Sequence, residues 1–136
     1  MFYVLAAMLL PFAVTLSHWV GDYILQIPFK DMAVKKKIDP QVAIIHCFIY
    51  TIAHIPMLWF YSLGSWEFVL VGFTLIFVLH FFQDYFEFPL GFFMKKIRGI
   101  GMWEPVLYVA IDNGYHWLTN YAIILGLFIL AIMTIV

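Results

Sequence analysis

The chain has 136 residues, of which 65% are hydrophobic and 11% are charged, and its formal net charge is −1 at pH 7. Soluble domains carry about 25% charged residues, so this composition excludes an ordinary soluble domain and indicates an integral membrane protein. The single cysteine, Cys47, rules out an intramolecular disulfide. The sequence has no glycine-rich nucleotide-binding motif, and we expect no nucleic acid partner.

Four apolar segments follow one another along the chain, at about residues 2–27, 40–60, 66–88 and 105–136. Each reaches the roughly 20 residues that a helix needs to cross a hydrocarbon core of about 30 Å. We therefore expect an all-α fold, a four-transmembrane-helix bundle that forms a single integral membrane domain over residues 1–136. Pro11 is a candidate kink in the first segment. The last segment is longer than one crossing needs, so we expect it to tilt, to project from the membrane, or to break near Gly114.

A weak repeat relates the two halves of the chain. The pattern His-x-x-x-Asp-Tyr occurs near the end of the first and third segments, at His18 and at His80. The separation in sequence between His18 and His80 is the same as that between His54 and His116. The bundle is therefore expected to consist of two related helical hairpins, and repeats of this kind often build a site at their shared interface.

All seven basic residues lie in two loops, residues 28–39 and 89–104. A four-span arrangement places both loops on the same side, and the positive-inside rule makes that side cytoplasmic. We expect an inner (cytoplasmic) membrane protein with both termini outside. Its partners would be membrane lipids, and its basic loops are suited to an anionic head group.

Three histidine–aspartate pairs at i,i+4 spacing lie inside these apolar segments. They are His18 with Asp22, His80 with Asp84, and Asp112 with His116. The spacing places both members of a pair on one helix face. An ionisable group in a bilayer costs several kcal/mol unless it is paired, bound to a metal or facing a cavity, so three such pairs indicate function.

The pairs also share a depth in the membrane. At about 1.5 Å rise per residue, their members and His46 lie about 6–16 Å from the cytoplasmic ends of their segments. Imidazole and carboxylate groups suit Zn, Mn or non-haem Fe. We expect one or two divalent ions, with zinc as the leading candidate and Mn or Fe as alternatives. The expected ligands are His18, Asp22, His46, His80, Asp84, Asp112 and His116.

Other interpretations of these residues stay open. The pairs could form a polar network that holds the helices together, or a row of groups along an ion or proton pathway. His54 lies deeper, about 21 Å from Pro40, and could be a ligand, a supporting group or a packed neutral histidine.

Three further polar residues continue the same helix faces. Glu87, three residues after Asp84, is a candidate general base or extra ligand, with an interfacial carboxylate as the alternative. Gln26 and Lys30 are candidates for orienting an anionic substrate at the mouth of the site.

Taken together, these motifs resemble a domain-of-unknown-function family of small four-helix bacterial and bacteriophage membrane proteins. The resemblance extends over nearly the whole chain and implies a shared site rather than a reaction. The sequence departs from the family pattern at Asn113, where glutamine is usual, and at Tyr50, where a second histidine can occur. It is more loosely similar to membrane-bound metal-dependent hydrolases.

The leading hypothesis is a metal-dependent hydrolase that acts on a lipid-linked or membrane-associated phosphoester at the cytoplasmic leaflet. Two-metal sites commonly activate water for this chemistry. The alternatives are a metal or proton transporter and a non-enzymatic membrane interaction protein. Homo-oligomerisation is compatible with the small size of the chain.

Overall fold

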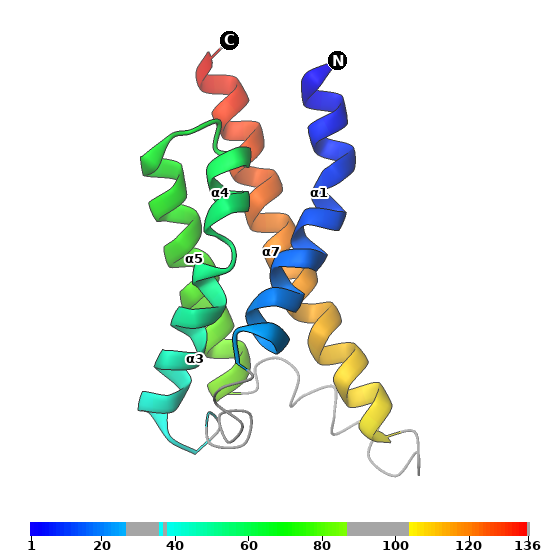
Figure 1. Cartoon of the computed structure of the whole chain (residues 1–136), viewed down its shortest axis with the longest axis vertical. Helices are drawn as coiled ribbons and strands as arrows, with labels where there is room; N and C mark the ends of the chain where they lie inside the picture. The colour runs from blue at the N-terminus through cyan, green and yellow to red at the C-terminus, as the bar shows by residue number, and fades with distance from the viewer. Residues whose placement is uncertain (27–35, 37, 87–103, 136) are drawn as a thin grey trace.

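The computed structural model describes residues 1–26, 36, 38–86 and 104–135, with the backbone alone for residues 104 and 105. Over these ranges all regular secondary structure is helical, as expected (Figure 1). The elements are α1 (Phe2–Trp19), the π-helix η1 (Val20–Ile24), α3 (Pro40–Ile52), α4 (Ile55–Tyr61), α5 (Trp66–Tyr85) and α7 (Glu104–Ile135).

Within the described ranges, three stretches of helix are long and apolar enough to cross a membrane: Phe2–Ile24, Trp66–Tyr85 and Val106–Ile135. The chain therefore has the character of a membrane protein. The predicted second segment passes the same test only when α3 and α4 are taken together, and these two helices are bent by 46° relative to each other.

The break between α3 and α4 has a local cause. Pro56 lies in the first turn of α4, where it cannot donate to the carbonyl of Ile52 and its ring crowds that carbonyl. The side chain of His54 lies at the break, with Nδ1 3.0 Å from the carbonyl oxygen of Tyr50.

A break in α7 near Gly114, one of the alternatives that the sequence suggests, is not found, because α7 runs through Gly114 without interruption. Pro11 likewise lies inside α1.

Capping residues define the starts of two helices. The carboxylate of Asp39 accepts a hydrogen bond from the backbone N–H of Gln41 at 2.9 Å, with Pro40 in the first turn of α3. The hydroxyl of Ser65 accepts one from the N–H of Phe68 at 3.4 Å at the start of α5. Both are favourable N-cap residues because their oxygens satisfy otherwise unpaired backbone donors.

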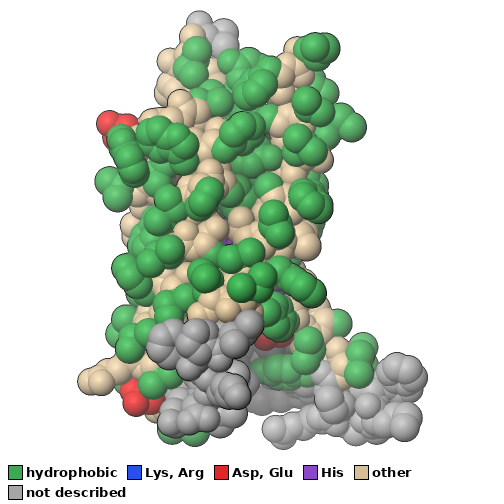
Figure 2. Space-filling view, viewed as in Figure 1, with side chains coloured by type: hydrophobic (Ala, Val, Ile, Leu, Met, Phe, Trp, Pro, Cys, Tyr) green, Lys and Arg blue, Asp and Glu red, His purple; other side chains and the backbone are tan. Residues whose placement is uncertain are grey.

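The helices pack in a ring. α3 lies against α5, α5 against α7, and α7 against α1, while η1 contacts α3. The interior of the ring is apolar over much of its length, and its fully buried members include Leu10, Val14, Ile76 and Ile124. Large hydrophobic side chains also cover the visible outer face (Figure 2), which is the surface that lipid tails would contact.

A close approach between η1 and α3 depends on Gly21. A Cβ atom on Gly21 would lie 2.9 Å from Cδ2 and 3.1 Å from the carbonyl oxygen of Tyr50. Close backbone approach at small residues is a common way for membrane helices to associate. The π-helical turn, closed by the hydrogen bond from the N–H of Leu25 to the carbonyl of Val20 at 2.9 Å, includes Gly21 and Asp22. π-Helical turns occur often at functional sites.

We expect Gly21→Ala to lower the free energy of unfolding by about 1–3 kcal/mol, because the added methyl group meets the ring and main chain of Tyr50. Gly126→Ala is the matched control. It lies in α7, and a Cβ atom added there would meet nothing within 4 Å, so it should be neutral or gain up to about 1 kcal/mol in helix propensity. Denaturant unfolding of both variants in detergent micelles measures the difference. Equal stability of the two would contradict the close packing of η1 on α3.

Candidate metal centre

The carboxylate of Asp84 is the point at which three helices meet. Its Oδ2 lies 2.6 Å from Nε2 of His46 and 3.1 Å from Nε2 of His80. Its Oδ1 lies 3.2 Å from Nε2 of His116. These histidines come from α3, α5 and α7, and all four side chains are buried. One carboxylate therefore faces different imidazoles with its two oxygens.

Two more carboxylates border this cluster. Oδ1 of Asp22 lies 3.7 Å from Nε2 of His46 and 3.9 Å from Nε2 of His80. On the other side, Oδ1 of Asp112 lies 3.5 Å from Nε2 of His116. Asp22 and Asp112 are partly exposed, whereas Asp84 is almost fully enclosed.

The structure thus brings six of the seven sequence-predicted ligands together in two groups. One ligand atom each from Asp22, His46 and His80 lies within 4.8 Å of the others, and the same holds for Asp84, Asp112 and His116. These buried histidine and aspartate groups could hold a metal ion. Around a tetrahedral ion with bonds of about 2.0–2.1 Å, neighbouring ligand atoms are about 3.3 Å apart, close to the 3.0 Å between Nε2 of His46 and Nε2 of His80.

The orientation of the three imidazoles of His46, His80 and His116 is also suited to metal binding. Nε2 of each ring is directed at the carboxylates, while Nδ1 of His46, His80 and His116 is buried without a hydrogen-bond partner among the described residues. A metal ligand must present an unprotonated nitrogen, which Nε2 of each ring can do when the proton is on Nδ1. The acceptor that usually receives that Nδ1 proton is not found in the described part of the chain.

His18, the seventh predicted ligand, has both ring nitrogens in other contacts. Its Nδ1 lies 2.7 Å from the hydroxyl of Tyr50, and its Nε2 lies 2.9 Å from Oδ1 of Asn113. Its i,i+4 partner Asp22 is 3.6 Å from Nδ1. The structure therefore places His18 beside the two groups, held by residues that are not themselves predicted ligands.

Tyr50 connects the histidines to one another. Its ring stacks on His80 with centroids 3.7 Å apart and an interplanar angle of 9°. Its hydroxyl lies between His18 and Asn120, the amide of which donates at 2.6 Å. The same amide nitrogen is 3.2 Å from Nε2 of His54. His54 is thus linked to the centre through Asn120 and Tyr50 and does not join either ligand group.

Among the described residues, Lys36 and Cys47 lie at the centre although the sequence does not predict them as ligands. Nζ of Lys36 lies 2.7 Å from Oδ2 of Asp84 and 3.2 Å from Nε2 of His46, whereas the lysine run by itself indicates a topology signal, or contact with anionic lipid or a phosphorylated substrate. Cys47 offers a ligand atom within 4.8 Å of His80 and Asp84, and zinc accepts thiolate. Neither residue belongs to a helical repeat of polar positions, so spacing gives no signal for them.

Of the predicted substrate-binding and catalytic residues, only Gln26 lies within the described ranges. Nε2 of Gln26 donates to Oδ1 of Asp22 at 3.2 Å and to the carbonyl of Gly21 at 2.9 Å, so its amide holds a candidate ligand in place. Lys30 and Glu87 lie outside the described residues.

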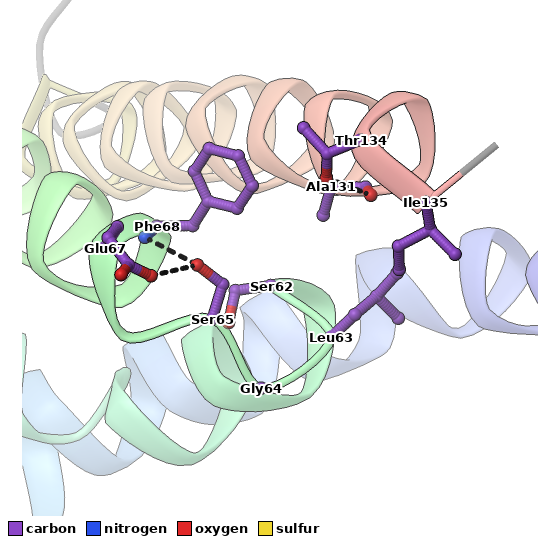
Figure 3. A pocket seen from close by; sticks show the side chains of 9 residues that line it. All are labelled: Ser62, Leu63, Gly64, Ser65, Glu67, Phe68, Ala131, Thr134 and Ile135. Atoms are coloured by element: carbon purple, nitrogen blue, oxygen red, sulfur yellow. Dashed lines mark hydrogen bonds between the residues drawn. The ribbon is translucent and has the colours of Figure 1, made fainter.

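A separate hollow lies between the turn that joins α4 to α5 and the last turns of α7 (Figure 3). Ser65 caps α5 there, since it donates to Oε2 of Glu67 at 2.8 Å and accepts from the N–H of Phe68. The hydroxyls of Ser62 and Thr134 donate to backbone carbonyls of their own segments. The described residues that line the hollow include no histidine or cysteine. We therefore interpret this hollow as a by-product of helix capping and not as a catalytic or binding site.

Comparison of the chain with protein-family models, curated proteins and solved structures finds no match. The resemblance inferred from the motifs therefore stays a prediction, and the function has to be inferred from the geometry of the centre.

Tyr50→Phe should lower the free energy of unfolding by about 1–3 kcal/mol, because it leaves Nδ1 of His18 and the amide of Asn120 without their buried partner. The ring and its stack on His80 are retained, so the change isolates the hydroxyl. Tyr3→Phe, at a side chain that is 40% exposed, is the matched control and should have little effect. Unfolding midpoints in micelles provide the measurement, and a neutral Tyr50→Phe would contradict the role of this hydroxyl.

Proposed function

We propose that this chain is a four-span integral membrane metalloprotein that hydrolyses a lipid-linked or membrane-associated phosphoester. The single observation that carries the proposal is the position of Asp84, whose Oδ2 faces His46 and His80 while its Oδ1 faces His116. A carboxylate in this position is suited to bridging two divalent ions.

The four-span arrangement is supported by the ring of packed helices and by the bent pair α3 and α4, which together are long and apolar enough to cross. Both chain ends lie at the same end of the molecule in Figure 1, as an even number of crossings requires. Under the positive-inside rule the two basic loops would be cytoplasmic and the termini outside. The two halves, α1 with α3–α4 and α5 with α7, would be the related hairpins.

The proposed two-ion centre divides the ligands at Asp84. One ion would be held by Oδ2 of Asp84 with His46, His80 and Asp22, and the other by Oδ1 of Asp84 with His116 and Asp112. Zinc is the leading candidate because the set is nitrogen and oxygen with a nearby thiol. Mn or Fe would accept the same nitrogen and oxygen donors.

Two divalent ions about 3.5–4 Å apart can lower the pKa of a bound water and neutralise charge that develops on a phosphoryl group. The chain's own residues would support this chemistry. Gln26 fixes Asp22, and the stack of Tyr50 on His80 fixes the orientation of that imidazole. Lys30 and Glu87 remain our candidates for holding the anionic substrate and for moving a proton.

Transport is the main alternative, and the extent of the polar network argues against it. Among the described residues, polar contacts connect Lys36 to Asp84 at one end and Asn120 to His54 at the other. Beyond His54 the buried side chains are mostly apolar, among them Leu10 and Leu58. The hydroxyls of Tyr61 and Ser62 are buried there too, but each donates to a backbone carbonyl. A continuous ion pathway would need polar groups there.

We expect about two divalent ions per chain in protein purified without chelator, as in other two-metal sites. Asp84→Asn should abolish or strongly reduce binding at both positions, because an amide is a poor bridging ligand. Asp39→Asn is the matched control, since it makes the same chemical change at the exposed N-cap of α3, where Asn also caps well. Elemental analysis and titration with Zn²⁺ or Mn²⁺ provide the measurement. Wild-type protein that binds neither ion would overturn the metal centre.

The hydrolase proposal has its own test. With Zn²⁺ or Mn²⁺ present, the wild-type protein should release inorganic phosphate from dodecyl phosphate in mixed micelles or from phosphatidic acid in vesicles. Asp84→Asn should lose about 100-fold or more of this rate, the scale expected when charge stabilisation at the reacting group is removed, while Asp39→Asn should keep it. If the wild-type protein and Asp84→Asn release phosphate equally, or neither releases any, the hydrolase proposal fails even where the metal measurement succeeds.

A further inference from the structure

Lys36 places an ammonium group inside the centre. Its Nζ lies 2.7 Å from Oδ2 of Asp84 and 3.2 Å from Nε2 of His46, and its side chain is only 15% exposed. A lysine at this position contacts two of the atoms that would hold the first ion in the proposed centre.

These contacts leave no room for a metal ion in the same arrangement. An ion bonded to Oδ2 of Asp84 and Nε2 of His46 at about 2.0–2.2 Å would need the space beside these two atoms that the ammonium now occupies. The two cations would also repel each other strongly, because the surroundings are buried and of low effective dielectric constant.

The ammonium also has a clear role when no ion is bound. A buried carboxylate without a compensating charge is strongly unfavourable, and Lys36 supplies that charge to Asp84. The 2.7 Å contact between Nζ and Oδ2 is that of a close ion pair.

We propose that Lys36 is a built-in competitor for the metal: its ammonium occupies the position between Asp84 and His46 in the ion-free protein and leaves it when a divalent ion binds. This inference rests on the proposed metal centre and adds a means of regulating it. The displaced ammonium becomes a free cation next to the centre, where it is suited to contact an anionic head group.

A purely structural ion pair would behave differently. If Lys36 only stabilised the fold, or if it helped to hold the ion indirectly, its removal would leave metal affinity unchanged or weaker. Competition predicts the opposite sign. Lys36→Met separates the two, because methionine keeps much of the apolar stem and removes the charge.

The first experiment measures Zn²⁺ and Mn²⁺ affinity by competition with a chromogenic chelator in micelles. Lys36→Met should bind about 10- to 100-fold more tightly than the wild-type protein, within the usual range of coupling between two ligands. Lys36→Arg keeps the charge and should not show this gain. Lys35→Met, the neighbouring lysine, is the control for general charge and should bind as the wild-type protein does.

The outcomes separate this inference from the metal centre itself. If the wild-type protein binds ions and Lys36→Met binds them equally or more weakly, competition is overturned and the centre stands. Binding by Lys36→Met alone would support competition in its strongest form. If neither protein binds, the metal centre falls, and the inference falls with it.

A second measurement needs no variant and therefore does not depend on the folding of one. Brief labelling of the wild-type protein with an amine-reactive reagent, read by mass spectrometry, should increase at Lys36 when Zn²⁺ is added. Labelling at Lys35 serves as the internal reference. Labelling of Lys36 that stays constant or decreases on addition of Zn²⁺ would contradict displacement of the ammonium.

Discussion

The burial of the Asp84 carboxylate is the constraint on which the rest of this structure depends. A carboxylate enclosed among apolar helices is tolerated only when cations and hydrogen-bond donors surround it. Three imidazoles and one ammonium meet this need, with the closest contacts at 2.6 Å to His46 and 2.7 Å to Lys36. Because these groups come from α3, α5, α7 and the loop before α3, satisfying one charge fixes how the elements are arranged around it.

The helices around this charge are held together by polar contacts and close approach, since lipid tails offer helices no hydrophobic drive to associate. The hydroxyl of Tyr50 connects α3 to His18 on α1 and to Asn120 on α7. Gly21 lets the π-helical turn lie directly on Tyr50, and Asp22 in that turn faces His46 and His80. The same contacts therefore pack the helices together and position the candidate metal ligands.

The parts of this arrangement that follow helical geometry could be predicted from the sequence. The i,i+4 spacing predicts that His80 lies near Asp84 and that His116 lies near Asp112, and depth along the helices predicts that His46 joins them. The all-helical fold follows from apolar segments of about 20 residues, the length that a helix needs to cross a membrane. These predictions need only the rise and period of a helix.

Other features could not be predicted because they depend on tertiary contacts or on backbone irregularities. Lys36 reaches Asp84 across 48 positions of sequence, and nothing in a lysine-rich loop indicates which lysine turns inward. The break before α4 depends on Pro56, whose effect the sequence does not distinguish from that of Pro11, although Pro11 lies within a continuous α1. The engagement of His18 by Tyr50 and Asn113 likewise requires the packing of three helices.

The shared carboxylate has a consequence for how such a centre would fill. An ion held by His46 and His80 would draw Oδ2 of Asp84 toward itself and so fix the direction of Oδ1, which faces His116. The first ion would thereby orient a ligand of the second, and the two positions would fill cooperatively. Asp22 and Asp112 each border only one group, so the loss of either should affect one position of the proposed centre, whereas the loss of Asp84 should affect both.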